Sequence, residues 1–171
     1  QMAGMEKEKG KMQISRIGIG MGDETCLTCY GKDDILNADY SFGAERMIAP
    51  YEAKVGKYPY YLAKDILTQL LALLEQGKHG KVAILFSGDT GFYSGAKKLY
   101  HALQTLTDVT VEVVPGISSI AYLAAKIPTS WEDAVIVSAH GVQEDVWKQQ
   151  LLWHGLHERK VFFLTSGVRD L

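Results

Sequence analysis

Four short segments of small and polar residues could carry chemistry, because each follows an apolar run with the length of a β-strand. They are residues 18–23, 87–94, 114–119 and 138–141, and a fifth apolar run ends in residues 164–167. Ligands of open α/β sheets bind at the carboxyl ends of strands. Glycine lets a ligand approach main-chain atoms closely. Together the segments predict one large ligand crevice.

The motif GIGMGD, which begins at Gly18, supports two interpretations. The alternate glycines Gly18, Gly20 and Gly22 permit a sharp turn between a strand and a helix, as in the dinucleotide fingerprint G-x-G-x-x-G. However, the third glycine comes one residue early and Glu24 stands where a small residue is needed. Asp39 precedes the second predicted strand, whereas a ribose-binding acid ends it. A nicotinamide or flavin site is therefore disfavoured, and a tight turn without a ligand stays an alternative.

Polar side chains in the other segments are candidates for binding or proton transfer. Asp89 could hold an ammonium group or ribose hydroxyls, or it could only cap the helix that follows. The hydroxyls of Ser118 and Ser119 have the same two interpretations. Asp23 and His140 are the candidate bases, although a histidine among small residues is more often a hydrogen-bonded structural group than a base.

Cys26 and Cys29 form a C-x-x-C pair within a predicted helix. A structural zinc site needs four ligands, and the sequence has no second such pair and no closely spaced pair of histidines. Two cysteines are also too few for a disulfide framework. We expect reduced thiols, no metal site and a cytoplasmic protein.

Apolar runs alternate with helical patterns along the chain. The predicted strands are residues 14–20, 40–43, 82–87, 109–114, 135–138 and 161–165. The predicted helices are residues 27–38, 44–48, 61–76, 91–106, 118–126 and 145–156. Runs such as VAILF are apolar at every position, which is typical of strands buried on both faces of a parallel sheet. The alternation predicts an α/β fold built from βαβ units.

The chain has 171 residues, 47% of them hydrophobic, and a formal net charge of −2. These values suit one soluble domain or two small ones and give no electrostatic reason to expect nucleic acid as a partner. The sequence contains no run of 18 apolar residues, so we predict no membrane-spanning helix. We expect a mobile extension or tag remnant at residues 1–12, an N-terminal α/β domain at 13–115 and a partial C-terminal α/β domain at 116–171.

The motifs GIGMGDETCLT, SGDTGFYS, VPGISS and SAHG, in this order and spacing, resemble the tetrapyrrole (corrin/porphyrin) methylase family. Its members use S-adenosylmethionine. The last three motifs, with ADYSFGAER at residues 38–46, are most similar to the branch that methylates C5 of precorrin-7, also called the precorrin-6Y branch, in cobalamin biosynthesis. The resemblance covers residues 14–167.

The resemblance implies two α/β domains with the active site in the trough between them. It also implies a precorrin substrate, a homodimer and a fused or separate partner enzyme that methylates C15 and decarboxylates. The glycine loop with Gly18, Gly20 and Gly22 would face the tetrapyrrole, whose acetate and propionate arms need cations such as Arg46. The implied contacts to S-adenosylmethionine are Gly88, Asp89, Phe92, Ser118, Ser119 and Thr165.

The sequence departs from the family pattern at three places. Glu24 stands where proline is common, and Cys26 and Cys29 replace apolar residues. Family members usually continue past the L-T-x-G strand, whereas this sequence ends at Leu171, so we expect a shortened C-terminal domain. A module that binds without turnover is therefore an alternative to the methyltransferase. A relative acting on ribosomal RNA or diphthine is another, which the charge balance and the G-F-Y-S residues disfavour.

Overall fold

The computed structural model describes residues 10–165 and separates the chain into two compact units, Gln1–Ser119 (unit 1) and Ile120–Leu171 (unit 2). Residues 1–9 of the expected extension lie outside the described residues. The predicted end of the extension at residue 12 is wrong. Met12 is the first residue of the first strand and is fully buried, so it belongs to the core. The division between the units follows Ser119 instead of residue 115. No described helix is long and apolar enough to cross a membrane.

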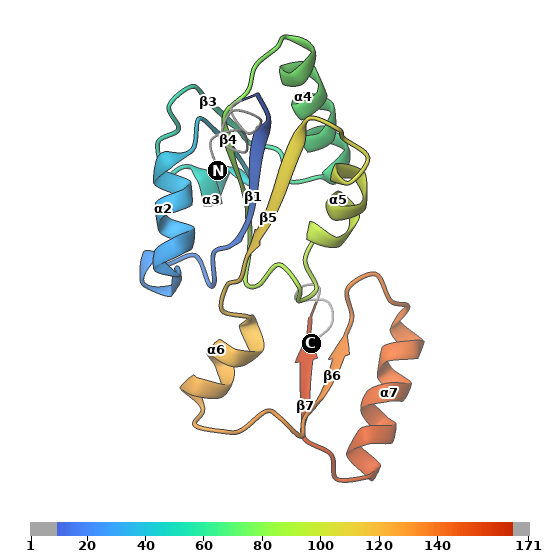
Figure 1. Cartoon of the computed structure of the whole chain (residues 1–171). Helices are drawn as coiled ribbons and strands as arrows, with labels where there is room; N and C mark the ends of the chain where they lie inside the picture. The colour runs from blue at the N-terminus through green and yellow to red at the C-terminus, as the bar shows by residue number, and fades with distance from the viewer. Residues whose placement is uncertain (1–9, 166–171) are drawn as a thin grey trace, which may run out of the picture. The chain divides into compact units, whose positions relative to one another are not determined.

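Unit 1 is a five-stranded parallel sheet with helices on both faces (Figure 1). The strand order is β3-β2-β4-β1-β5. The strands are β1 (Met12–Gly18), β2 (Tyr40–Phe42), β3 (Gly56–Tyr58), β4 (Lys81–Phe86) and β5 (Val109–Val114). Because all strands run the same way, the loops that follow β1, β4 and β5 emerge side by side at one edge of the sheet.

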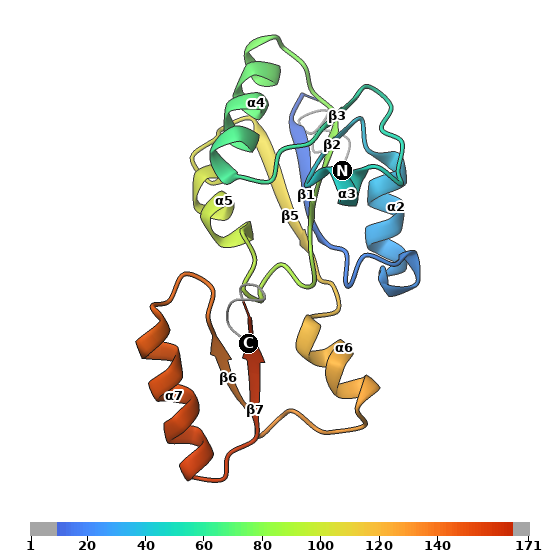
Figure 2. The ribbon, with the colours of Figure 1, turned by 180° about the vertical axis from the view of Figure 1, so that it is seen from behind.

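The helices of unit 1 divide between the two faces, as Figures 1 and 2 show. The helices α4 (Ala63–Glu75) and α5 (Ala96–Leu103) share one apolar cluster with alternate residues of β1 and β4. The helices α2 (Cys29–Asn37) and α3 (Glu45–Ile48) pack on the other face, over the intervening residues of those strands. Both faces of β4 are therefore buried, which explains its uninterrupted apolar run.

Unit 2 contains the parallel strand pair β6 (Val135–Ser138) and β7 (Val161–Leu164) in its described part. The helix α7 (Glu144–Leu156) packs on this pair, where the ring centres of Trp147 and Phe163 lie 4.9 Å apart. The remaining helix is α6 (Ser119–Lys126), which begins at the end of unit 1. Of the predicted strand ending, Thr165 is described and residues 166–167 are not.

The structure differs from the sequence prediction in several local details. The predicted helix at residues 91–106 begins only at Ala96, because residues 90–95 form a loop in which Tyr93 has a φ of 46°. The short strand β3 has too few residues for a period-two pattern and was not predicted. Cys26 lies in a single 3₁₀ turn (Glu24–Cys26) and only Cys29 lies in α2.

Candidate functional site

Three glycines touch one another at the carboxyl ends of β1, β4 and β5: Gly18 is the last residue of β1, and Gly88 and Gly116 follow β4 and β5. A Cβ atom placed on Gly18 would lie 2.7 Å from the amide nitrogen of Gly116 and 2.7 Å from the carbonyl oxygen of Gly88. A Cβ atom placed on Gly116 would lie 2.3 Å from that same oxygen. Only residues without a side chain allow such an approach of backbones. We call these three residues the glycine junction.

Backbone hydrogen bonds connect the first two loops of the junction. The amide of Gly20 donates to the carbonyl of Gly88 at 3.1 Å, and the amide of Gly88 donates back to the carbonyl of Gly20 at 2.7 Å. Both residues have φ near the left-handed region, at 66° and 68°. The two glycines of the sequence motifs therefore fix the loop after β1 to the loop after β4.

Asp89 connects the second loop of the junction to the third. Its Oδ1 accepts a hydrogen bond from the amide of Gly116 at 2.9 Å, and its Oδ2 accepts one from the amide of Gly91 at 3.0 Å. Both carboxylate oxygens thus bind the main chain. Asp89 does not cap α5, which begins seven residues later at Ala96. It orders the loops that follow β4 and β5.

Gly88 is buried, and the space beside its Cα atom is just large enough for a Cβ atom. A Cβ atom added there would meet no atom closer than 3.8 Å, and the nearest atoms belong to Met21, Ile117 and Ser118. Gly88 is therefore enclosed by all three loops, at the sheet edge where α/β proteins bind ligands.

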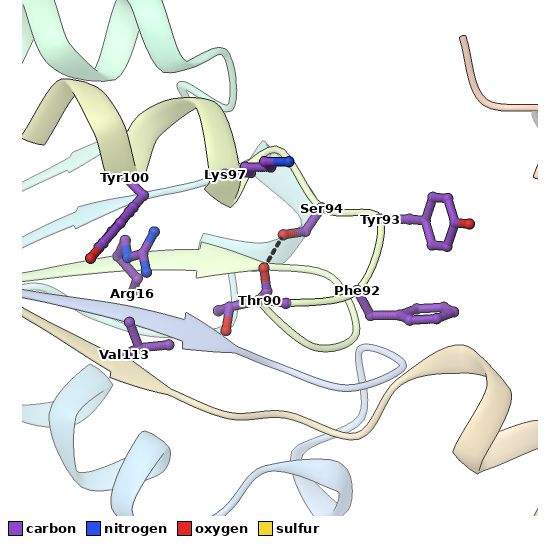
Figure 3. Close-up of a pocket in the computed structure, with 9 residues that line it drawn as sticks. Arg16, Thr90, Phe92, Tyr93, Ser94, Lys97, Tyr100 and Val113 are labelled. Atoms are coloured by element: carbon purple, nitrogen blue, oxygen red, sulfur yellow. Dashed lines mark hydrogen bonds between the residues drawn. The ribbon is translucent and has the colours of Figure 1, made fainter. Parts of the chain in front are cut away.

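A pocket of about 660 Å³ lies next to the loop that follows β4, on the α5 face of the sheet (Figure 3). Phe92 and Tyr93 project from the loop at one end, with their rings 5.0 Å apart and nearly perpendicular. Ser94 stabilises the loop, because its hydroxyl donates to the carbonyl of Thr90 at 2.6 Å. Phe92 therefore belongs to the pocket as well as to the S-G-D motif.

Arg16 lines the same pocket and was not predicted as a site residue. It lies within β1 and is only 6% exposed. Its Nη1 donates to the carbonyl of Ala96 at 3.0 Å, and its guanidinium carbon lies 4.7 Å from the ring centre of Tyr100. Burial lowers the pKa of Arg16, and the nearby Tyr100 opposes this shift. The sequence contained one signal for this residue: Arg16 places a charge at a strand position where an apolar residue is expected.

The glycine loop reaches a second, smaller pocket of about 180 Å³. Gly22 and Arg46 both line it, together with Met21 and Tyr51. The structure thus brings together two residues that the resemblance placed on the substrate side. Gly18 ends β1 and Gly20 lies in the loop that follows, where each contacts Gly88 as described above.

Asp23 is the N-cap of the 3₁₀ turn that follows the glycine loop. Its Oδ1 accepts a hydrogen bond from the amide of Thr25 at 2.8 Å. This bond favours the ionised carboxylate and lowers the pKa of Asp23, with a small opposing contribution from burial. A general base near neutral pH needs the opposite shift. The local geometry therefore gives Asp23 a capping function.

The remaining predicted residues occupy two places. Ser118 precedes α6 and Ser119 is its first residue, both within unit 1 and directly after the loop of Gly116. His140 and Thr165 belong to unit 2, where they follow β6 and β7. His140 is exposed, and its Nδ1 lies 3.3 Å from the hydroxyl of Ser138, which also accepts from the amide of His140.

Asp39 lies at the wrong edge of the sheet for a dinucleotide site. Its Oδ2 accepts a hydrogen bond from the amide of Lys81, the first residue of β4, at 2.8 Å. The glycine loop follows the opposite, carboxyl end of the strands. The ribose contact that a Rossmann site requires is therefore missing from this loop, which agrees with the early third glycine. Residues 10–165 also hold no cluster of His, Cys, Asp or Glu suited to a metal ion.

Comparison with known proteins identifies relatives over almost the entire chain. The family model described as Tetrapyrrole (Corrin/Porphyrin) Methylases matches residues 13–170. A probable cobalt-precorrin-7 C(5)-methyltransferase of Methanocaldococcus jannaschii is 33% identical over 156 residues, covering 90% of this chain and 72% of the relative. The cobalt-precorrin-7 C(5)-methyltransferase of Salmonella typhimurium is 29% identical over 162 residues, covering 92% and 75%.

Solved structures show the same fold. The crystal structure of the methyltransferase CobJ superposes with a TM-score of 0.72 at 18% identity, covering 89% of this chain and 67% of that one. At this identity the likeness concerns the fold alone. It agrees with the α/β architecture and the parallel sheet expected from the sequence.

Proposed function

Because the chain belongs to the tetrapyrrole (corrin/porphyrin) methylase family, we propose that it is an S-adenosylmethionine-dependent methyltransferase acting on C5 of a precorrin or cobalt-precorrin in cobalamin biosynthesis. The family uses S-adenosylmethionine as its methyl donor. The two curated relatives described above carry the C5-methyltransferase name, and each match covers at least 90% of this chain. These relatives support the substrate and the methylated position.

The glycine junction is the observation that carries this proposal. It brings Gly88 and Asp89 next to the loops of Gly18 and Gly116, so that residues from three motifs of the sequence form one site. The small space beside the Cα atom of Gly88 is enclosed by these loops, at the sheet edge where α/β proteins bind ligands. Ser118 borders the same space through its Cα atom.

The site suits methyl transfer because its loops are held in fixed positions by hydrogen bonds. When bound, S-adenosylmethionine supplies an electrophilic methyl group on a sulfonium whose sulfur leaves as a neutral thioether. The contribution of this chain is to hold donor and acceptor in line and to exclude water. Holding two reactants in this way contributes roughly 7–11 kcal/mol in favourable cases. The hydrogen bonds of Asp89 and Gly20 keep the loops in place for that task.

The substrate side lies at the glycine loop in this proposal. Arg46 and Gly22 line the smaller pocket, where the guanidinium can bind a carboxylate arm of the tetrapyrrole. Phe92 and Ser119 are proposed as cofactor contacts in unit 1, and Thr165 in unit 2. His140 remains the candidate proton acceptor, since the lowered pKa of Asp23 makes that carboxylate a weak base.

Calorimetry and an activity assay test the proposal in two steps. The chain should bind S-adenosylhomocysteine and should not bind NADH when both are titrated under the same conditions. Incubation with S-adenosylmethionine and a precorrin-7 or cobalt-precorrin-7 substrate should then add one methyl group at C5, detected by mass spectrometry and NMR. Binding of NADH without binding of S-adenosylhomocysteine would refute the methyltransferase. Cofactor binding without methyl transfer would instead support a binding module.

A further inference from the structure

Arg16 is a buried cation on an apolar surface. Residues 12, 14 and 16 of β1 point to the same face of the sheet, and Met12 and Ile14 belong to the apolar cluster under α4 and α5. Arg16 continues this row with only 6% of its surface exposed. An arginine keeps its charge in proteins, so its burial is costly unless a partner compensates it.

The fold compensates this charge only in part. One nitrogen, Nη1, donates to the carbonyl of Ala96, and the ring of Tyr100 covers the guanidinium at 4.7 Å. The Nε atom is buried and has no hydrogen-bond partner among the described residues. Within residues 10–165, Arg16 also forms no ion pair with a carboxylate. A buried guanidinium with an unused donor is expected to meet an acceptor from elsewhere.

The large pocket is where such an acceptor can come from. Arg16 and Val113 line it from the sheet, and Lys97 and Tyr100 line it from α5 (Figure 3). Lys97 adds a second cation, and none of the described residues that line the pocket is acidic. The lining therefore combines positive charge with aromatic surface from Phe92. This combination suits an anionic group attached to an apolar or conjugated body.

We propose that Arg16 anchors a carboxylate-binding subsite in this pocket. Arginine matches a carboxylate in shape as well as in charge, because its planar N–H groups can bind both oxygens. The choice of ligands rests on the function proposed above, in which both the methyl donor and the tetrapyrrole carry carboxylates. The aminocarboxyl end of the donor and a side arm of the tetrapyrrole are the two sources to be distinguished.

Binding by variants of Arg16 provides the test. Arg16→Met removes the charge and keeps an unbranched apolar side chain, which suits this face of the sheet. Arg16→Lys keeps the charge without the planar N–H groups. Lys98→Met is the matched control, since Lys98 is an exposed cation on α5 that does not line the pocket. Thermal unfolding first establishes that all variants are folded.

The probes are S-adenosylhomocysteine, 5′-methylthioadenosine and uroporphyrin III, each titrated by calorimetry. We expect Arg16→Met to weaken at least one carboxylate-bearing probe by about tenfold or more, Arg16→Lys to weaken it less, and the control to bind as the parent chain. Loss confined to S-adenosylhomocysteine, with methylthioadenosine unchanged, assigns the subsite to the donor. Loss confined to uroporphyrin III assigns it to the tetrapyrrole.

A second measurement reads the guanidinium directly. The Nε–H signal of Arg16, assigned in a ¹⁵N NMR spectrum by its absence from Arg16→Met, should shift when the bound probe is added. Unchanged binding of all probes by Arg16→Met, or an Nε signal that no probe moves, would overturn the subsite. If the parent chain binds uroporphyrin III through Arg16 but no S-adenosylhomocysteine, the subsite stands and the proposed function fails.

Discussion

Substitution of Asp89 tests whether ordered loops, and not a direct charge on the ligand, make the cofactor site. Asp89→Ala removes both acceptors, at Gly116 and at Gly91. Asp89→Asn keeps one carbonyl oxygen but places an NH₂ group against the other backbone N–H. The structure therefore predicts a graded series in which alanine is worse than asparagine.

The size of the effect follows from the two hydrogen bonds. A hydrogen bond to a charged group contributes roughly 1.5–3 kcal/mol, and Asp89 is partly exposed, so the lower figure applies. Since about 1.4 kcal/mol changes an affinity tenfold, Asp89→Asn should weaken S-adenosylhomocysteine roughly tenfold and Asp89→Ala about 100-fold. The loss appears in binding because the loops must then be ordered by the ligand.

Calorimetric titration of the two variants against the parent chain measures the series. Asp33→Asn is the control, because Asp33 is an exposed carboxylate on α2. Thermal unfolding of each protein shows how much of the loss is a loss of stability. Parent-like affinity of a folded Asp89→Ala would refute the reasoning, and so would equal losses in the alanine and asparagine variants.

The glycine junction and the Asp23 cap give further predictions. Gly116→Ala should lower the free energy of unfolding by roughly 1–3 kcal/mol in urea titrations, because its Cβ atom would lie 2.3 Å from a carbonyl oxygen. Gly95→Ala is the control, because its Cβ atom would meet nothing within 4 Å and the free energy of unfolding should change little. Gly88→Val forces a branched residue to a φ of 68° and adds methyl groups where a Cβ atom already contacts its neighbours. Calorimetry should therefore show S-adenosylhomocysteine binding weakened by about tenfold or more. Asp23→Asn should lower the melting temperature at neutral pH, and by progressively less as the pH falls below about 4. The reason is that the pKa of Asp23 is lowered in the folded chain, so this residue stabilises the fold only while its carboxylate is ionised. A difference in melting temperature that persists unchanged at pH 2 would contradict this.

The sequence predicted the strands well where apolar runs had clear ends. The bounds of β5 and β6 agree with the prediction, and β4 is displaced by one residue. These elements depend on local patterns, since a parallel strand buried on both faces must be apolar throughout. The start of α5 could not be predicted in the same way. Phe92 extends the helical apolar period of α5 toward the N-terminus, but Asp89 and Ser94 bind nearby main-chain groups and hold residues 90–95 in a loop.

The two most informative features of the site were decided by tertiary structure. The motifs placed Asp89 at a strand end, but its bond to Gly116 spans 27 positions in the chain and requires β4 and β5 to lie on either side of β1. The sequence likewise shows an arginine in a strand, yet the pocket above Arg16 exists only because α5 begins late and leaves the carboxyl end of the sheet uncovered. Spacing along the chain fixes which residues end the strands. Only the order of the strands fixes which of those residues touch.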